Sequence, residues 1–427
     1  MSKVLLVNPR YNFPVKTEMY PSGALLLLGT LAKNLGHDVE LLHMVTDRLT
    51  DDDIAEHVRI YRIDVVAITV NTFQVKSAKR LISAIKQVSG ARVVIGGAHP
   101  SSVGIDEARR EFPQADDIII GEGEFPFLSI LENRTITKPD DLEYVTHPDL
   151  SLVNHLSRFI GAYPLGRSPA MFLMASRGCP NQCTFCNRAI FGNKVRYRSP
   201  ENVLKELGYF AGRGIKEVFI QDDTFNLNRA WYEEILQRII AEGLHKRMSF
   251  RAPFRADCKL VDRKVLDLAK KAGFWLLFYG VENGNQGMLD RMHKRLSLEE
   301  VERAVRLSKE AGLKVETSFI IGLPGETVQT VSDTARFYRK LAPFWSGCGV
   351  AIPFPSTGIA TEVREQIKDI PFEDYRPGKI YFRTDELDFD DISESHSRIE
   401  RLMLHDKMVN MIGSPGVLLR TIRDRMH

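Results

Sequence analysis

The chain has 427 residues, of which 44% are hydrophobic, and a formal net charge of +3. These values predict two or three domains of about 150 residues each, with buried cores. The mild charge, with no basic run interleaved with aromatic residues, argues against nucleic-acid binding. No stretch approaches about 18 consecutive apolar residues, so we expect no membrane span. Five cysteines, none before Cys179, do not form a disulfide framework and favour a reducing compartment, the cytoplasm.

The first third of the chain alternates short β-rich runs with helical patterns. The expected strands are residues 3–7, 39–43, 65–70, 92–95 and 117–120, and helical apolar spacing marks residues 22–35 and 76–88. This rhythm is typical of βαβ units, in which helical crossovers join parallel strands. We therefore predict a doubly wound, Rossmann-like α/β domain over residues 1–134, with ligands bound outside the carboxyl ends of its strands.

The second half repeats this rhythm after a linker. Pro, Asp, His and Ser are frequent from 135 to 168, as in a linker. Strands are expected at 171–176, 217–221, 248–251, 274–281, 314–321 and 348–354, and helices at 201–211, 229–242, 262–271, 298–311 and 328–340. These six βα units, within 169–358, are fewer than the eight of a closed barrel. Residues 359–427, with charged helices at 373–376 and 393–411, are expected to form a small, mainly helical region that caps the barrel mouth and sets specificity.

The most informative motif is Cys179-x3-Cys183-x2-Cys186, with Phe185 just before the last cysteine. Iron–sulfur clusters are ordinarily held by four thiolates. Three cysteines leave one iron without a protein ligand, and an open position is typical of catalytic metal sites. A structural zinc site would need a fourth ligand at close spacing. The loop contains no fourth cysteine and no histidine, and His155 lies upstream of it. The motif therefore favours a cluster over zinc.

This motif resembles the signature of the radical S-adenosylmethionine (SAM) enzymes. In that family the open iron chelates the amino and carboxylate groups of SAM, and one electron from the reduced 4Fe-4S cluster yields a 5′-deoxyadenosyl radical. The resemblance implies a partial (β/α)6 barrel over residues 169–358, with its chemistry at the carboxyl ends of the strands. It also implies an electron donor such as flavodoxin or ferredoxin.

Acidic residues at the strand ends are candidates for SAM binding. Glu282, after the fourth strand, resembles the acidic residue that many family members place near SAM, while a structural salt bridge is the alternative. Asp222 and Asp223 follow the second strand. We expect one of the two to be functional, because an acidic pair at a helix N-terminus also serves as a cap.

Glycines, arginines and an aromatic residue complete the SAM-binding candidates. Gly322 and Gly325, in Gly-Leu-Pro-Gly-Glu after the fifth strand, resemble the adenine-side motif of the family, and capping alone would explain Glu326. Arg251 or Arg255 is expected to bind the SAM carboxylate or an anionic substrate. Phe185 is a further candidate. Cys258 and Cys348 are most simply buried thiols.

The N-terminal sheet resembles the cobalamin-binding domain of one radical SAM branch. The resemblance rests on the order of Asn8-Pro9, a helix that contains Pro21-Ser22-Gly23, Gly96-Gly97-x-His99-Pro100 and Gly121-Glu122-Gly123-Glu124. A tight βα turn also explains a glycine pair, so a sheet without a cofactor is the alternative. The candidate cobalamin contacts are Asn8, Pro9, Arg10, Thr69, Asn71, Gly96, Gly97, His99, Gly121 and Glu122.

One motif of that branch is missing. Cobalamin proteins that place a histidine under cobalt carry Asp-x-His-x-x-Gly after the first strand, where this chain has Asn8-Pro9-Arg10-Tyr11-Asn12-Phe13. We therefore expect no histidine ligand to cobalt from this motif. His99 has two interpretations, a residue of the ligand crevice or a residue of the turn.

Together these patterns predict a cobalamin-dependent radical SAM enzyme, most simply a methyltransferase at an unactivated carbon of a small-molecule natural product or specialised metabolite. The resemblance implies two SAM molecules per turnover. One rival is radical cyclisation, ring contraction or oxidation without methyl transfer. Another is a cobalamin-binding sensor or carrier with a structural metal site. A methylthiotransferase is disfavoured, because that class needs cysteines in its N-terminal domain and none precedes Cys179.

Overall fold

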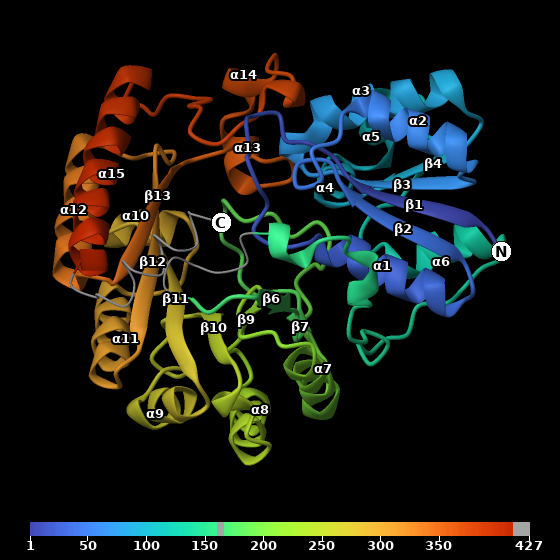
Figure 1. The fold of residues 1–427 in the computed structure, drawn as a ribbon. Coiled ribbons are helices and arrows are strands. Elements are labelled where there is room, and N and C mark those ends of the chain that lie inside the picture. The colour runs from blue at the N-terminus through green and yellow to red at the C-terminus, as the bar shows by residue number, and fades with distance from the viewer. Residues whose placement is uncertain (160–165, 413–427) are drawn as a thin grey trace.

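The computed structural model describes residues 1–159 and 166–412. In these residues the chain forms two parallel sheets that lie side by side (Figure 1). The strand order is β2-β1-β3-β4-β5 in the first sheet and β13-β12-β11-β10-β9-β6 in the second. Positions 160–165 of the expected linker and 413–427 of the C-terminal region lie outside the described residues.

The N-terminal sheet has helices on both faces, as predicted. Its strands are β1 Lys3–Asn8, β2 Asp38–His43, β3 Val65–Thr69, β4 Arg92–Gly96 and β5 Asp117–Ile118. Leu5 and Val7 point into one apolar core, with α2 and α3, and Val4 and Leu6 point into another, with α1 and α6. The helices are α1 Gly23–Asn34, α2 Asp51–Tyr61, α3 Val75–Val88, α4 Ala98–Val103, α5 Ile105–Glu111 and α6 Glu124–Glu132, and the 3-10 turn η1 is Thr72–Gln74.

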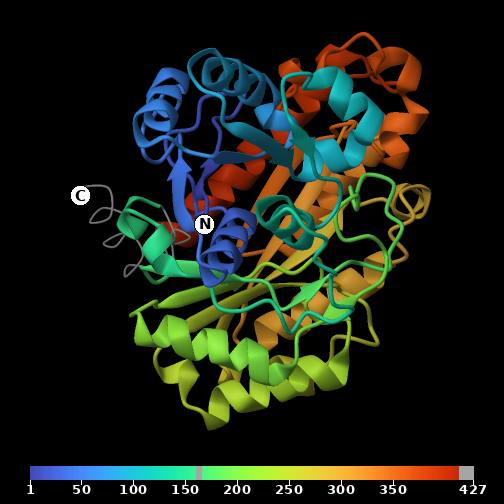
Figure 2. The same ribbon diagram turned by 90° about the vertical axis from the view of Figure 1, so that its right-hand side faces the viewer.

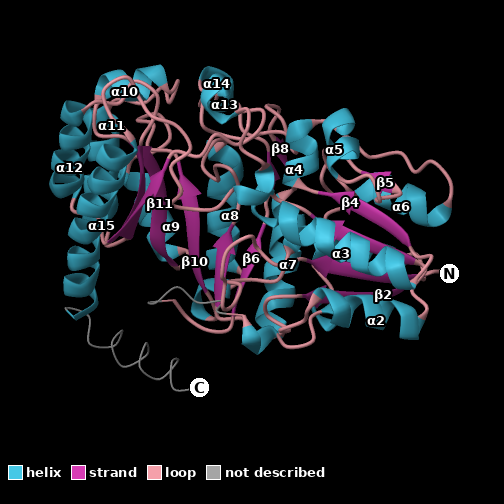
Figure 3. Ribbon diagram, turned by 90° about the horizontal axis from the view of Figure 1, so that it is seen from above, coloured by secondary structure: helices cyan, strands magenta, loops and turns pink. Residues whose placement is uncertain are grey.

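The second sheet is the predicted partial barrel. Its strands are β6 Ala170–Leu173, β9 Glu217–Ile220, β10 Ser249–Phe254, β11 Phe274–Glu282, β12 Lys314–Ile321 and β13 Trp345–Val350. Its helices are α7 Pro200–Gly212, α8 Arg229–Ala241, α9 Arg263–Lys271, α10 Gln286–Arg291, α11 Leu298–Glu310 and α12 Val328–Leu341. Strands β6 and β13 form the two edges and are not paired with each other, so the barrel stays open (Figure 3).

Two strand predictions differ from the structure. The expected strand 171–176 is interrupted after Leu173, because the Asp222 carboxylate accepts the backbone N–H of Ala175 at 2.7 Å in place of a neighbouring strand. The chain then forms β7 Ser176–Arg177, which pairs antiparallel with β8 Arg196–Tyr197. The last strand begins three residues earlier than expected, at Trp345, and ends four residues earlier, at Val350, before Pro353, which has no N–H for a ladder bond.

The C-terminal region does not form a single cap. Helix α15, Phe389–Ile412, runs along the edge strand β13, where His396 contacts the carbonyl of Cys348 at 3.0 Å. This helix therefore covers the outside of the barrel, and its predicted position over the mouth is wrong. The shorter elements α13 Gly358–Glu362, α14 Arg364–Ile367 and the 3-10 turn η5 Phe372–Asp374 lie between the barrel and the N-terminal domain (Figure 1).

The N-terminal domain is stacked on the barrel (Figure 2). The ring of Phe73, in η1, lies 5.4 Å from that of Phe354, after β13. None of the helices in the described part of the chain is long and apolar enough to cross a membrane.

Candidate functional site

The three cysteines lie on a loop that the β7–β8 hairpin closes. Cys179 and Cys183 are half-buried, and Cys186 is exposed. Burial raises the pKa of the Cys183 thiol, and burial together with the two neighbouring thiols raises the pKa of Cys186 to about 11. The three thiols are therefore close enough to repel one another as thiolates, a charge that a bound metal centre would neutralise.

The spacing of the sulfur atoms bears on the choice between a cluster and zinc. The three motif sulfurs do not all lie within 4.8 Å of one another, whereas ligand atoms of Asp257, Cys258 and Glu300 do. Thiolates on one tetrahedral zinc, with Zn–S bonds of about 2.3 Å, are only about 3.8 Å apart. The wider set fits ligands of different irons better than three ligands of one zinc.

Contacts from three parts of the chain fix the cysteine loop. Thr184 receives hydrogen bonds on both sides: its N–H donates to Met292 O, and its carbonyl accepts the N–H of Ile359, each at 3.0 Å. The side-chain amide of Asn187 donates to Ser102 Oγ at 2.6 Å and to Pro355 O at 3.2 Å. The loop is thus held by the end of α10, the start of α13 and helix α4 of the N-terminal domain.

The two aspartates after β9 have different roles. Asp222 is buried, accepts Ser176 Oγ at 2.6 Å, and has its pKa raised to about 6 by burial. It shapes the start of the cysteine loop. Asp223 is exposed and accepts the Gly178 N–H at 3.1 Å. Of the two SAM-binding candidates, Asp223 is therefore the one with a carboxylate open to a ligand.

Glu282 ends β11 in a strained conformation. Its φ is +71°, in the left-handed region, and residues held there cluster at functional sites. Lys294 donates to its carboxylate at 2.8 Å and Ser318 at 3.1 Å. Lys294 Nζ also lies 5.6 Å from the ring centre of Phe185. The pair Glu282–Lys294 therefore lies against the cysteine loop, which brings two of the SAM-binding candidates together.

The Gly322–Gly325 turn is held from inside by Glu326. This carboxylate is almost fully buried, accepts the Gly322 N–H at 2.5 Å, and accepts the side-chain amide of Asn283 at 2.9 Å. Burial raises its pKa to about 7. Helix α12 is instead capped by Thr327, so Glu326 orders the turn and does not cap the helix. Both glycines have positive φ, +78° and +79°.

Arg251 is not at the end of its strand. Strand β10 continues to Phe254, and Arg251 within it is paired with Glu217 at 3.0 Å and donates to the hydroxyl of Tyr20. Arg255 follows the strand and donates to the carbonyl of Arg295 at 2.8 Å. The strand-end position predicted for Arg251 is therefore wrong, because the alternating pattern did not show how far the strand runs.

A cavity of about 450 Å³ lies where the carboxyl edge of the N-terminal sheet meets the barrel. Asn8, Thr69 and Asn71 line it from the sheet, and Phe172 and Gln221 line it from the barrel. Pro9 lies beside it, with its carbonyl bonded to Gln74 at 2.9 Å, and Arg10 donates to Leu49 O at 3.0 Å. No histidine is among the described residues that line this cavity.

The segment 11–22 forms much of the cavity wall and contains a buried acid. Glu18 accepts Thr46 Oγ at 2.8 Å and the amide of Asn8. Burial raises its pKa to about 7. Tyr11 and Tyr20 are on the same wall. Glu18 therefore joins the end of β1, through Asn8, to Thr46 by hydrogen bonds beside the cavity.

Gly97 is required by the sheet itself. Its φ is +108°, and a Cβ atom there would lie 2.9 Å from Val70 O and 3.0 Å from Thr69 Oγ1. A Cβ at Gly96 would meet only Ile119, at 3.4 Å. The close approach at Gly97 is thus made by the end of β3 and by Val70, the residue after it, so a bulky residue at Gly97 would disturb the fold and cannot test ligand binding.

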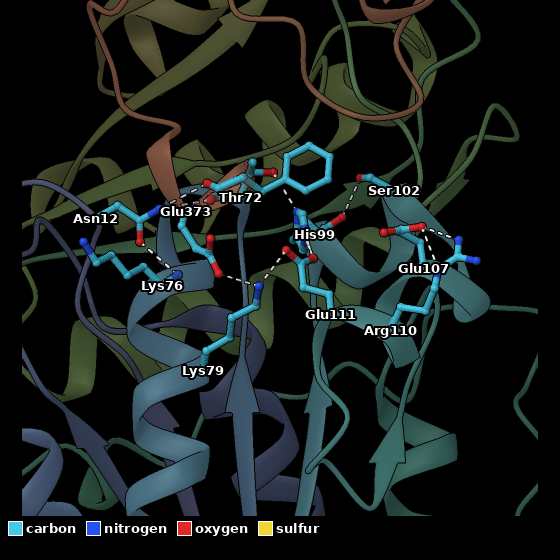
Figure 4. A network of polar contacts seen from close by, with 12 residues as sticks. Asn12, Thr72, Lys76, Lys79, His99, Ser102, Glu107, Arg110, Glu111 and Glu373 are labelled. Carbon is cyan, nitrogen blue, oxygen red and sulfur yellow. Dashed lines mark hydrogen bonds and ion pairs between the residues drawn. The ribbon is translucent and has the colours of Figure 1, made fainter. Parts of the chain in front are cut away.

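His99 belongs to a polar network inside the N-terminal domain (Figure 4). It is fully buried, with Nδ1 3.2 Å from Thr72 Oγ1 and Nε2 2.5 Å from Glu111 Oε2. Lys79 links Glu111 to Glu373 of η5. Both ring nitrogens of His99, which lies in α4, are therefore bonded inside the N-terminal domain.

Glu122 also has protein partners. Its carboxylate accepts Arg177 and Lys138, each at 2.6 Å, and Arg196. Burial would raise its pKa, but hydrogen bonds from Lys138, Arg196 and Arg177 lower it to about 2. Gly121, with φ +79°, donates its N–H to Ser101 Oγ at 2.9 Å.

Comparison with known proteins places both halves of the chain in families. The model of the radical SAM superfamily matches residues 173–338, and that of the B12 binding domain matches residues 11–131. The chain therefore carries a radical SAM domain and, before it in the sequence, a B12 binding domain. It is thus a cobalamin-dependent radical SAM enzyme, and the cofactors that its families imply are those predicted: a 4Fe-4S cluster, SAM and cobalamin.

Individual relatives match most of the chain. It is 29% identical to the uncharacterized methyltransferase PH0819 of Pyrococcus horikoshii, over 84% of this chain and 82% of the relative. It is 27% identical to the anaerobic magnesium-protoporphyrin IX monomethyl ester cyclase of Cereibacter sphaeroides, over 87% of this chain and 65% of that protein. The fold is similar to that of the radical SAM methyltransferase TsrM from Kitasatospora setae, with a TM-score of 0.68, 21% identity, and coverage of 87% of this chain and 76% of that one.

Three residues of the site were not expected from the sequence. Lys294 is a basic residue outside any motif, 12 positions from Glu282, and Arg177 pairs with Glu122, 55 positions away. Glu18 lies in a loop without a helical or strand pattern. The only signal was weak: Arg177 directly precedes Gly178-Cys179.

Proposed function

We propose that this enzyme is a methyltransferase that acts on an unactivated carbon of a small molecule, a natural product or specialised metabolite. The observation that carries the proposal is the cavity that both domains line. It brings the carboxyl edge of the B12 binding domain, at Asn8 and Thr69, against barrel residues Phe172 and Gln221. A transferable methyl group and a substrate radical must meet in such a place.

The chemistry follows from the groups that the two domains bind. When bound, the cluster and SAM would supply hydrogen abstraction from the substrate, and cobalamin would supply the methyl group. Cys179, Cys183 and Cys186 would hold the cluster. Among the residues around it, Asp223 offers a carboxylate for the ammonium group of SAM.

The Glu282–Lys294 pair offers both signs of charge beside the cysteine loop. A carboxylate suits ribose hydroxyls or an ammonium, and an ammonium suits a carboxylate. Because both side chains are about nine-tenths buried, their geometry is set before a ligand arrives, which lowers the entropic cost of binding. The aromatic side chains Tyr11, Phe13 and Phe172 on the cavity wall would keep water from the reacting carbon.

The names of the relatives support methyl transfer and leave one competitor. PH0819 and TsrM are named methyltransferases, whereas the Cereibacter sphaeroides protein is named a cyclase. Cyclisation, ring contraction or oxidation is therefore the second candidate. A sensor or carrier with a structural metal site is less well supported, because the sulfur spacing does not fit a single zinc. No cysteine precedes Cys179, so methylthiotransferase chemistry lacks its N-terminal ligands.

Anaerobic reconstitution with iron, sulfide and hydroxocobalamin, followed by incubation with SAM, a reductant and candidate metabolites, tests the proposal. A methyltransferase adds 14 Da to the substrate and forms S-adenosylhomocysteine together with 5′-deoxyadenosine. A cyclase or oxidase forms 5′-deoxyadenosine and a product that has lost hydrogen. Absence of 5′-deoxyadenosine from reduced, cluster-loaded protein would leave only the sensor or carrier.

The proposal also includes the electron donor, the cellular compartment and the bounds of the domains. The electron donor would be a flavodoxin or ferredoxin, and a reducing compartment such as the cytoplasm would keep the cluster intact. The proposed units are the cobalamin-binding domain at 1–134, the linker at 135–168, the barrel at 169–358 and the C-terminal region at 359–427.

A further inference from the structure

Arg177 connects the cysteine loop to the B12 binding domain. It is the last residue of β7, two positions before Cys179, and its side chain is only 5% exposed. Its guanidinium donates to Glu122 Oε2 and to Glu124 Oε1, each at 2.6 Å. Both carboxylates belong to the N-terminal domain: Glu122 lies between β5 and α6, and Glu124 is the first residue of α6. The ion pairs therefore cross the interface between the two domains.

Glu122 also binds the other strand of the hairpin. Its Oε1 accepts Arg196, which stands directly opposite Arg177 in the β7–β8 pairing. The cysteine motif lies between these two arginines in sequence. One carboxylate of the N-terminal domain thus bridges both strands at the base of the cysteine loop.

Neighbouring contacts restrict the same place. The Arg177 guanidinium lies 5.0 Å from the ring centre of Phe191, in the segment that returns from the cysteines. Gly178 has φ +91° and packs against the carbonyl of Lys194 so closely that no Cβ atom fits. Lys138 adds a third cation to Glu122 at 2.6 Å. The base of the loop is therefore a tight, charged and buried joint, which we call the hairpin joint (Glu122, Glu124, Arg177, Arg196).

A buried joint of this kind is weak evidence for stability but strong evidence for fixed geometry. Desolvating several charges costs about as much as their attraction returns, whereas removing one partner leaves another charge buried and unpaired. Its members belong to both domains, so the ion pairs resist movement of the hairpin relative to the N-terminal domain.

We infer that Glu122 and Glu124 are positioning residues of the cluster-binding loop, and that they act through Arg177 and Arg196 and not as contacts of cobalamin. The inference rests on the proposed assignment of the cluster to Cys179, Cys183 and Cys186. It makes the B12 binding domain a structural part of the SAM-cleaving site. Misplacing the loop by about 1 Å lowers a reaction rate on the order of 100-fold.

The test uses the full chain with Glu122→Gln, which keeps the size of the side chain and removes its charge. The matched control is Glu143→Gln. Glu143 also joins the segment before the barrel to the barrel, through the N–H of Ser199 at 2.6 Å and Asn202, but it does not touch the hairpin. Glu122→Asp is the second variant. It retains the negative charge with a shorter side chain, and it serves as the test if Glu122→Gln does not fold.

The first measurement is hydrogen–deuterium exchange of residues 178–195 in protein without cofactors. We expect faster exchange in this segment for Glu122→Gln and no change for Glu143→Gln. For Glu122→Asp we expect an exchange rate between those of the wild type and Glu122→Gln. If Glu122→Gln is unfolded, the exchange rate of Glu122→Asp alone tests the inference. Unchanged exchange in the folded Glu122 variants would overturn the inference.

The second measurement is electron paramagnetic resonance (EPR) of the reconstituted, reduced protein with and without SAM. For Glu122→Gln we expect a weakened SAM-induced change in the cluster spectrum and 5′-deoxyadenosine formation lowered on the order of 100-fold, with cobalamin retained as in the wild type. Loss of cobalamin with a normal cluster spectrum would instead make Glu122 a cofactor contact and overturn the inference. Failure of the wild type to bind a cluster would contradict the proposed function itself.

Discussion

At the scale of single residues, Glu282 combines three observations: a left-handed backbone, burial and a lysine partner. Glu282→Gln should weaken SAM binding about 10- to 100-fold, because a hydrogen bond to a charged group is worth about 1.5–3 kcal/mol. Isothermal titration with cluster-loaded protein measures this change. The variant should also lose stability, because it leaves Lys294 buried without its partner.

The matched control is Glu206→Gln, which breaks another buried ion pair, with Arg198 at 2.6 Å. It should lower the free energy of unfolding by a similar amount, about 3–5 kcal/mol, without affecting SAM. Equal SAM affinity in the wild type and both variants would show that the Glu282–Lys294 pair is only structural.

Glu18 makes a prediction about pH. Its pKa is about 7 in the folded protein, against an ordinary value of 4.5, so the folded state holds a proton that the unfolded state releases. Between about pH 4.5 and 7 the unfolded state thus binds fewer protons, and stability falls as pH rises. The loss attributable to Glu18 is about 3 kcal/mol at pH 8.

Denaturant unfolding of the cofactor-free protein at pH 5 and pH 8 checks this. Glu18→Gln should reduce the difference in free energy between the two pH values by about 2.5 kcal/mol, while the exposed Glu299→Gln should leave it unchanged. An identical pH dependence in wild type and Glu18→Gln would show that Glu18 titrates normally.

At the scale of elements, the sequence predicted what is local. The cysteine spacing, the β-rich runs and the helical periods each depend on neighbouring residues, and they identified both sheets and the cysteine loop. The sequence could not predict contacts between residues that are far apart along the chain. Nothing near Asp222 shows that its carboxylate ends a strand 47 positions earlier, and nothing near Gly97 shows that β3 occupies the space of its missing side chain.

The same limit explains the arginines. A guanidinium inside a strand and one after it look alike when the strand length is unknown, so Arg251 and Arg255 could not be distinguished. In the hairpin joint, Glu122 is 55 positions from Arg177 and 74 positions from Arg196 along the chain. Only the folded chain brings these residues together.

The cysteine loop makes a prediction of its own at this scale. Alanine substitution of Cys179, Cys183 or Cys186 should abolish the 4Fe-4S absorbance after reconstitution, because a cluster with two protein ligands is poorly held. Cys258→Ala and Cys348→Ala should keep it. Cys258 lies on the surface beside Glu300, so the prediction that it is buried is wrong, and Cys348 is buried on β13, under α15. Stoichiometric zinc with neither iron nor sulfide in the wild type would refute the cluster.

At the scale of the whole molecule, the arrangement of the two domains predicts how their cofactors depend on each other. Cobalamin is expected in the cavity between Asn8, Thr69 and the barrel, beside the wall formed by residues 11–22. The double substitution Val15→Trp and Thr17→Trp would place two large rings in this wall. The side chains of Val15 and Thr17 make no hydrogen bond to another described side chain, so the substitution removes none. It should prevent cobalamin retention, while Thr17→Val should not.

The cluster should survive that double substitution, because neither position touches the cysteine loop or the hairpin joint. SAM cleavage without substrate should therefore continue, while methyl transfer stops. In the wild type the Co(II) EPR spectrum should lack nitrogen superhyperfine splitting, because no histidine among the described residues lines the cavity and both nitrogens of His99 are already bonded. Nitrogen splitting from the protein would contradict this view of the cavity, and a double variant that still retains cobalamin would place the cofactor elsewhere.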